Sequence, residues 1–186
     1  MNKNVEQYQP IKIKPSNGLR IWSGLATIGG TAACVFLIIQ GLKFNSSYSI
    51  LYLGTGLMFL PFMANLMFWG LPAYIPGKIL FEITRGENGV IRSNNKSVPI
   101  REINDIEMVR NNFTLYNNIR ISTTHGKTVY IKTYNVLMEY SFVEAIDNYA
   151  YPYMNPYAKE VWDRKVENNQ YLKDMDYVRK NHKIDQ

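Results

Sequence analysis

The pattern of apolar and polar residues divides the chain into two long apolar segments and a mostly polar remainder. Charged residues are absent between Arg20 and Lys43, and again between Lys43 and Lys78. The two apolar segments cover residues 21–42 and about 49–71. At about 1.5 Å per helical residue, each is long enough to cross a hydrocarbon core of about 30 Å. The sequence therefore predicts two membrane-spanning helices.

These helices form a predicted hairpin over residues 21–74, because the polar loop Lys43–Tyr48 is short enough to make them antiparallel neighbours. The first helix is rich in small residues spaced four apart, which allows close approach of helix backbones. The pairs are Ala26 with Gly30 and Gly29 with Ala33. The second helix is their simplest partner, and a homo-oligomer built through the same residues is the alternative.

Aromatic side chains mark the predicted membrane interfaces, where Trp and Tyr are enriched. The expected interface anchors are Trp22, Tyr48, Trp69 and Tyr74. Within the second helix, Pro61 removes one backbone hydrogen bond and predicts a kink. Asn65 is expected to form an interhelical hydrogen bond rather than to mark a transport path. Pro72 is expected to help end this helix.

Basic residues predict the orientation of the hairpin. Residues 1–20 contain four bases, whereas the connecting loop contains only Lys43. The positive-inside rule then places both termini in the cytoplasm and the loop outside. Residues 1–20 show no periodic apolar pattern and are expected to form a separate flexible or extended arm. This arm serves as a topogenic flank or as a basic contact with anionic headgroups.

The pattern changes to an alternation of apolar and polar residues from Lys78 onward, which is typical of strands. Six or seven short antiparallel strands are expected before Thr133, with turns at Asn111–Asn112 and His125–Gly126. Residues 136–149 then have the spacing of an amphipathic helix. The sequence thus predicts a small antiparallel sheet, capped by a helix, in a domain over residues 75–157.

The stretch VPIREINDIEMV at residues 98–109 adds a resemblance to this picture. With two apolar helices before it and a helix after it, it is similar to bacterial membrane proteins that carry a PH-like domain. Val98, Pro99 and Ile100, followed by Ile103 and Ile106, match the apolar spacing of that group. The resemblance covers about residues 78–150 and implies a seven-stranded PH-type barrel. It also implies a multi-pass protein of a bacterial cell membrane, similar to small membrane proteins of Bacillus-type bacteria.

Tyrosines and a tryptophan near the C-terminus are the candidate partner-binding residues, since such side chains often anchor interfaces. They are Tyr151, Tyr153, Tyr157 and Trp162. The alternative is that the tyrosine segment packs along its own sheet or at the headgroup level. Residues 158–186 are expected to form a charged C-terminal helix. Its sparse apolar stripe fits packing on the sheet, contact with a membrane surface or pairing with another copy.

Charge and reactive residues narrow the function classes. The net charge is +6, and its excess flanks the apolar segments instead of forming the basic stripe that nucleic acid requires. A single cysteine, Cys34, excludes a disulfide within the chain. His125 and His182 have no metal-ligand partner at helical or hairpin spacing. No catalytic residue, cofactor or metal is predicted.

Two hypotheses of function follow from the sequence. The first is a membrane-anchored interaction module, in which the bilayer holds a domain that binds a protein partner or supports a membrane complex. The second is a small transport-associated or toxin-immunity membrane component that acts through its helices. Transport usually requires ionisable groups within the membrane or broken helical repeats. The first hypothesis therefore fits the sequence better, and no enzymatic activity is expected.

Overall fold

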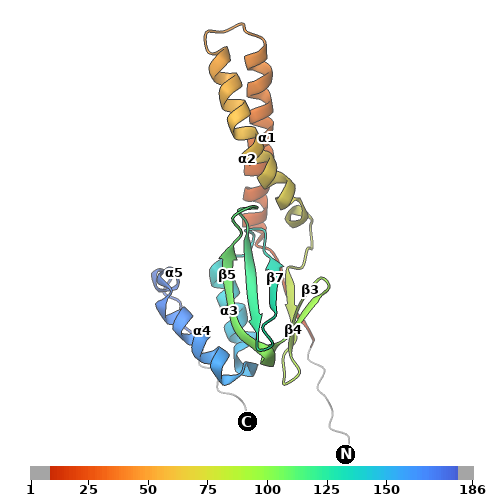
Figure 1. The fold of residues 1–186 in the computed structure, drawn as a ribbon, viewed down its shortest axis with the longest axis vertical. Coiled ribbons are helices and arrows are strands. Elements are labelled where there is room, and N and C mark those ends of the chain that lie inside the picture. The colour runs from red at the N-terminus through yellow and green to blue at the C-terminus, as the bar shows by residue number, and fades with distance from the viewer. Residues whose placement is uncertain (1–8, 180–186) are drawn as a thin grey trace, which may run out of the picture.

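The computed structural model describes residues 9–179. Two long antiparallel helices, α1 (Asn17–Leu42) and α2 (Ser49–Tyr74), project from an α+β domain (Figure 1). Each contains 26 residues and is long and apolar enough to cross a membrane. Large apolar side chains along both are exposed, including Trp22 at 74% and Met58 at 75%. Such a surface needs a cover of lipid or protein, because contiguous apolar area is rarely left in water.

Small residues line the seam between the two helices and recur mostly at seven-residue intervals. This interval is the heptad repeat of a left-handed pair of packed helices. The buried seam positions are Gly24, Thr27, Cys34 and Gly41 in α1 and Ser49, Gly56, Gly70 and Ala73 in α2. Close packing through small residues, as predicted, therefore joins the two helices of one chain.

The closest contacts in this seam involve glycines for which no larger residue fits. A Cβ atom on Gly41 would lie 2.6 Å from the backbone nitrogen of Leu53. One on Gly56 would lie 2.6 Å from Cγ1 of Ile38. Of the four small residues predicted to pack, only Gly30 lies close to the other helix, where a Cβ atom would be 2.9 Å from Met63 Sδ; Ala26, Gly29 and Ala33 are exposed. The sequence indicated the kind of packing but only part of its register.

Both helices extend beyond their predicted bounds. α1 begins at Asn17, before the predicted Ile21. α2 runs without interruption through Pro61 and Pro72 to Tyr74, so the predicted end at residue 71 was wrong. A proline so close to the end of a helix disturbs little, because few helical residues follow it.

Two antiparallel sheets form the core of the α+β domain. One has the strand order β1-β2-β3-β4 and the other the order β5-β6-β7. The strands of the first sheet are β1 (Ile11–Ile13), β2 (Phe81–Ile83), β3 (Val90–Ser93) and β4 (Lys96–Pro99). Those of the second are β5 (Ile103–Arg110), β6 (Asn117–Thr123) and β7 (Thr128–Lys132). A short 3-10 turn, η1 (Ile100–Glu102), joins the two sheets.

Strand β1 corrects the prediction that residues 1–20 form a separate arm. Its residues pair with β2 in antiparallel register, with Ile11 opposite Ile83. Just after it, the backbone N–H of Ser16 donates to the carbonyl of Val136 at 2.8 Å. Residues 1–8 of the predicted arm lie outside the described residues. The apolar hairpin is consequently inserted between the first and second strands of one sheet.

Helix α3 (Glu139–Tyr149) covers the sheets and completes a single apolar core. Ile121 and Ile131 are 0% and 2% exposed, which confirms the predicted inward faces of β6 and β7. On α3, Phe142 and Ile146 are equally buried. The predicted turn at His125–Gly126 joins β6 to β7, and Gly126 has a φ of +73°, a conformation that favours glycine.

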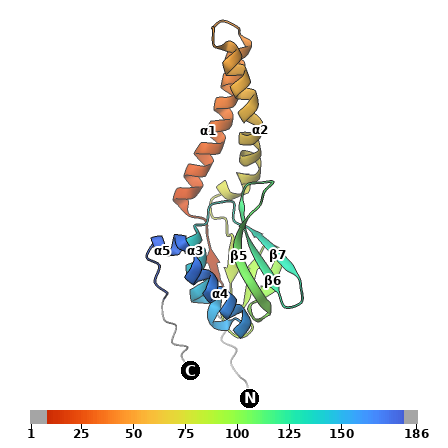
Figure 2. The same cartoon turned by 60° about the vertical axis from the view of Figure 1, so that its left-hand side comes forward.

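The C-terminal region folds back onto this core. A 3-10 turn, η2 (Tyr151–Tyr153), leads into α4 (Pro156–Asn168) and then α5 (Gln170–Asp174). α4 lies beside α3 and β5 (Figure 2). The predicted single helix over residues 158–186 was wrong, because the backbone leaves the helical conformation at Asn169. Residues 180–186 of that prediction lie outside the described residues.

Candidate functional site

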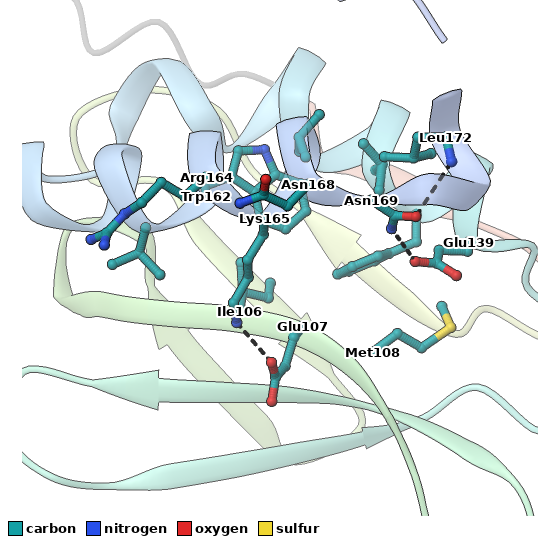
Figure 3. A pocket seen from close by; sticks show the side chains of 14 residues that line it. Ile106, Glu107, Met108, Glu139, Trp162, Arg164, Lys165, Asn168, Asn169 and Leu172 are labelled. Atoms are coloured by element: carbon teal, nitrogen blue, oxygen red, sulfur yellow. Dashed lines mark hydrogen bonds and ion pairs between the residues drawn. The ribbon is translucent and has the colours of Figure 1, made fainter. Parts of the chain in front are cut away.

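A cleft between β5 and the C-terminal helices is a candidate binding site in the described part of the chain. It has a volume of about 610 Å³, within the range of small-ligand and peptide sites (Figure 3). We call it the β5–α4 groove. Its lining residues are Ile106, Glu107, Met108, Glu139, Phe142, Val143, Val161, Trp162, Arg164, Lys165, Val166, Asn168, Asn169 and Leu172.

Apolar side chains make the floor of the groove. Ile106 comes from β5, Phe142 and Val143 from α3, and Val166 from α4. All four belong to the continuous core of the domain. The alternation of β5 turns Ile106 inward, while the helical spacing of α3 places its two residues side by side. A ligand on this floor would be held by contact with a preformed apolar surface.

Charged side chains bridge the groove near its middle. The Lys165 ammonium on α4 donates to Asp105 Oδ1 at 2.5 Å and to Glu107 Oε2 at 2.7 Å, both on β5. Arg120 on β6 forms an ion pair with Glu107. These groups are partly exposed, so solvent screens the pairs and each contributes modestly to stability. Their main structural effect is to fix α4 over the free edge of β5.

The corner between α4 and α5 closes one end of the groove. Asn169 Oδ1 accepts from the N–H of Leu172 at 3.3 Å and so caps α5. Its Nδ2 donates to Glu139 Oε1 on α3 at 2.6 Å. Arg164 lies toward the opposite end (Figure 3). Its side chain is 65% exposed and pairs with Glu160 one turn away at 3.5 Å. The Arg164 end therefore offers a cation, and the other end is already hydrogen-bonded.

A buried carboxylate behind α4 organises the chain that follows α5. Asp147 is 3% exposed and accepts from Trp162 Nε1 at 2.7 Å and from the Tyr177 hydroxyl at 2.8 Å. Arg179 donates to Asp147 through Nη2 at 2.8 Å and to Asp163 through Nη1 at 2.5 Å. A buried charge with this many partners is stable in place. The network has the character of a structural clamp.

The pKa shifts of Tyr177 and Arg179 keep the hydrogen bonds of this clamp in place at neutral pH. Burial raises the pKa of Tyr177, and its hydrogen bond to Asp147 raises it further. Burial alone would lower the pKa of the Arg179 guanidinium, but its hydrogen bonds to Asp147 and Asp163 raise the pKa overall. Tyr177 thus keeps its proton and Arg179 its charge at neutral pH, so the hydrogen bonds persist.

The structure does not bring the predicted partner-contact residues together on one exposed surface. Trp162 is 3% exposed and stacks edge-on against Phe142. The Arg179 guanidinium lies over the Tyr151 ring, 4.5 Å from the centre of that ring. Tyr153 is half-buried. Tyr157 is exposed at 60%. The predicted contact set is thus mostly internal, whereas the groove that Trp162 helps to line was not predicted.

The predicted interface anchors occupy different settings on the hairpin. Trp22 is exposed near the start of α1, and Tyr48 is exposed just before α2, at the other end of the hairpin. Trp69 packs edge-on against Phe68 and carries Lys132 over its ring. The Tyr74 hydroxyl instead hydrogen-bonds Thr27 Oγ1 at 2.8 Å, inside the helix seam. Tyr74 therefore joins the two helices.

A glycine on α2 lets the domain attach tightly to the hairpin. A Cβ atom on Gly70 would lie 2.5 Å from the Tyr116 hydroxyl and 2.6 Å from the Tyr74 hydroxyl. Tyr116 donates to the carbonyl of Leu66 at 2.6 Å. Asn65, expected to bond the other helix, donates to the carbonyl of Phe113 at 3.4 Å. The partner of Asn65 is therefore a domain loop, a contact for which the sequence has no local signal.

Three lysines line a second cavity next to this junction, with a volume of about 330 Å³. Lys78 follows α2, Lys96 begins β4 and Lys132 ends β7. Sequence reasoning missed this cluster, because its members are far apart along the chain and meet only through strand pairing. The three lysines thus give this cavity a basic lining.

The fold and the groove define a class of protein in which an α+β domain with a binding cleft carries an apolar helical hairpin. Residues 9–172 match the model of a family of unknown function, DUF5381, and the chain belongs to that family.

Two relatives come from Bacillus subtilis (strain 168). The uncharacterized lipoprotein YfjD is 32% identical over 174 residues, covering 89% of this chain and 94% of YfjD. The uncharacterized protein YfjE is 32% identical over 145 residues, covering 74% of this chain and 95% of YfjE. No solved structure matches the chain.

Proposed function

We propose that the protein is a membrane-anchored binding module, in which α1 and α2 span the bilayer and the β5–α4 groove holds a segment of a partner protein. Each helix would be about 39 Å long at about 1.5 Å per residue, enough to span with some tilt. Their exposed apolar side chains suit lipid. The glycine seam and the bond from Asn65 to the Phe113 carbonyl favour an anchor over a transport path.

The hairpin is oriented with both termini in the cytoplasm. Lys12, Lys14 and Arg20 precede or begin α1, and the lysine cavity follows α2, whereas the loop between the helices carries only Lys43. Basic residues close to the ends of spanning helices stay on the cytoplasmic side. The α+β domain then lies against the inner leaflet.

The α+β domain is of the PH type, with the hairpin inserted into its first strand connection. Support for this proposal comes from the order of the described elements. Four strands in one antiparallel sheet and three in a second are followed by α3, which covers the core. The resemblance at residues 98–109 falls on β4, η1 and β5, where the chain passes from one sheet to the other.

Membrane attachment by the helices needs no lipid on this chain. The relative YfjD is described as a lipoprotein, and a cysteine thiol is one position at which a protein can carry an acyl chain. The only cysteine here is Cys34, which is 7% exposed in the middle of α1 and faces α2. An acyl chain has no room at that position.

Metabolic labelling with an alkynyl fatty acid should therefore leave this protein unlabelled, and labelling that disappears in Cys34→Ala would contradict this assignment.

The groove is the single observation that carries a binding function. It is a preformed cleft of about 610 Å³ with an apolar floor. Its one solvent-exposed cation, Arg164, lies at the open end. These features fit a peptide segment with a few apolar side chains and an acidic residue near Arg164. Action is by binding and not by turnover.

Site-specific photo-crosslinking tests this proposal in native membranes. A photoreactive phenylalanine analogue at Val161, which lines the groove, should give a protein adduct of defined mass. The same group at Glu167, exposed on α4 outside the groove, is the matched control and should not. Arg164→Glu should reduce the adduct at residue 161, while Arg164→Lys should retain most of it. An adduct of lipid mass, or equal protein yields at both positions, would contradict the proposal.

A further inference from the structure

The loop between β5 and β6, residues 111–116, carries an exposed phenylalanine toward the hairpin. Phe113 at its tip is 75% exposed, although it belongs to a well-packed domain. The loop lies at the end of the sheet from which α1 and α2 project (Figure 1). An aromatic side chain so exposed is costly in water unless a second surface covers it.

Two hydrogen bonds fix this loop alongside α2, well above the end of the helix. Asn65 Nδ2 donates to the Phe113 carbonyl at 3.4 Å, and the Tyr116 hydroxyl donates to the Leu66 carbonyl at 2.6 Å. Asn65 precedes the last residue of α2, Tyr74, by nine positions, or about 13 Å at about 1.5 Å per residue. The loop tip therefore reaches past several turns of α2.

Exposed phenylalanines of α2 surround the same level. Phe62 and Phe68 lie three residues on either side of Asn65 and are 46% and 65% exposed. Further toward the domain, Leu71 and Ile75 are still exposed at 47% and 57%. If α2 spans the bilayer as far as the interface residue Trp69, four residues beyond Asn65, then Phe113 continues the apolar surface of α2 and lies within the hydrocarbon region.

Most backbone N–H groups of the loop have hydrogen-bond partners within the protein. Irregular backbone is tolerated at membrane depth only when its polar groups are bonded within the protein. Asn111 Oδ1 accepts from the N–H groups of Phe113 and Thr114, at 3.0 and 2.9 Å. The Leu115 N–H donates to the Asn111 carbonyl at 2.8 Å, and the Asn111 N–H donates to the Tyr116 carbonyl at 2.9 Å. The loop is thus internally hydrogen-bonded around its tip.

We infer that Phe113 inserts into the bilayer as a third point of membrane attachment, beside the two helices. This inference rests on the proposed spanning of α1 and α2, and its partner is the hydrocarbon of the inner leaflet. Arg110, exposed at the base of the loop, is placed to meet lipid phosphates while Phe113 is immersed. A third attachment opposes tilting of the domain relative to the bilayer, because tilting would lift Phe113 out of the hydrocarbon, so the β5–α4 groove keeps a fixed angle to the membrane.

Fluorescence quenching by lipids tests this insertion. The full-length Cys34→Ala protein is labelled with an environment-sensitive fluorophore at one introduced cysteine and reconstituted into vesicles that contain spin-labelled lipids. Phe113→Cys reports on the loop, and Phe62→Cys reports on α2 near the same depth. His125→Cys, in the exposed β6–β7 turn at the other end of β6, is the control. We expect strong, similar quenching at residues 62 and 113 and none at 125.

The outcomes separate this inference from the proposed function. Quenching at residue 62 without quenching at 113 would overturn the insertion of Phe113 and leave the spanning helices intact. Absence of quenching at 62 would overturn both, because α2 would then lie outside lipid. Equal quenching at 113 and 125 would show adsorption of the whole domain to the surface, and it would likewise contradict a specific insertion by the loop.

Discussion

Trp162 supplies both an apolar ring and a polar group to the interior of the domain. Its ring packs edge-on against Phe142 with centres 5.9 Å apart, and its Nε1 donates to Asp147 at 2.7 Å. Asp147 in turn holds Tyr177 and Arg179. One side chain thus connects the groove floor to the clamp that follows α5, so its loss affects both.

Trp162→Ala should lower the free energy of unfolding by about 3–5 kcal/mol, because it leaves a cavity and removes one partner of a buried carboxylate. Thermal unfolding of the full chain in detergent measures this effect as a lower Tm. Tyr157→Ala, at a position that is 60% exposed on the same helix, is the control and should change stability by less than about 0.5 kcal/mol. Equal Tm values for both variants would contradict the buried position of Trp162.

The sequence does not show which of Trp162 and Tyr157 is buried, since both are large aromatic residues near the start of the C-terminal segment. Which one is buried depends on how α4 is rotated against α3, and that rotation is set by distant partners such as Asp147 and Asp105. The groove was beyond prediction for the same reason, because its walls come from β5, α3 and α4. The inward faces of β6 and β7 were predictable from alternation within a single strand.

At the scale of elements, the hairpin is the part most completely encoded by local sequence. Two apolar runs without charge determine two helices, and a short loop makes them antiparallel. Their register depends on which glycines face the partner helix, which spacing alone predicted only in part. Gly54 and Gly56 show the difference, since both lie in α2 and only Gly56 contacts α1.

Gly56→Ala should destabilise the hairpin, because the new methyl group would lie 2.9 Å from the carbonyl oxygen of Cys34 and still closer to Ile38. Gly54→Ala is the control, with nothing within 4 Å of its new atom, and should be neutral or stabilising by up to about 1 kcal/mol. Thermal unfolding in detergent compares the two variants. A larger loss of Tm in Gly54→Ala than in Gly56→Ala would show that the helices pack on another face.

Strand β1 was missed because three residues give too little alternation to stand out in a polar segment. Its partner β2 follows it only after the whole hairpin, so no local pattern connects them. A unit limited to residues 78–150, the extent of the resemblance, therefore lacks β1 and α4, although β1 is part of the first sheet and α4 contributes Trp162 and Val166 to the core.

Fragments of the soluble region test how much of the chain the domain needs. Residues 9–16 joined by a flexible Gly/Ser linker to residues 76–179 should unfold cooperatively, because β1 can then reach β2. Residues 78–150 alone should show a weaker and broader transition. Within the linked fragment, Ile121→Asp should cost several kcal/mol by burying an unpaired charge. If residues 78–150 melted as cooperatively as the linked fragment, β1 and α4 would be dispensable.

At the scale of the whole molecule, the orientation of the hairpin decides which compartment the groove faces. With both termini cytoplasmic, the β5–α4 groove is open to cytoplasmic partners and the loop at residues 43–48 is outside. The fixed attachment of the domain to α2, through Tyr116 and Gly70, would keep this arrangement rigid.

Single cysteines in the Cys34→Ala background report this orientation. Ser46→Cys should react with a membrane-impermeant thiol reagent in intact cells, because residue 46 lies in the outer loop. Gln186→Cys should react only after the cells are opened. Labelling of Gln186→Cys but not of Ser46→Cys in intact cells would reverse the orientation, and it would place the groove outside.

The insertion of the hairpin between β1 and β2 also sets an order of assembly. During synthesis β1 leaves the ribosome first, but its partner strand follows only after both helices have been made. If the helices pair in the bilayer as proposed, they bring the ends of β1 and β2 together, and the entropy cost of closing that long connection has already been met. Under the proposed insertion, completion of the sheet would then follow insertion of the hairpin. Failed insertion would leave the edge of β2 open to proteases and to other strands, so an incorrectly inserted copy would be recognised by its unfinished domain.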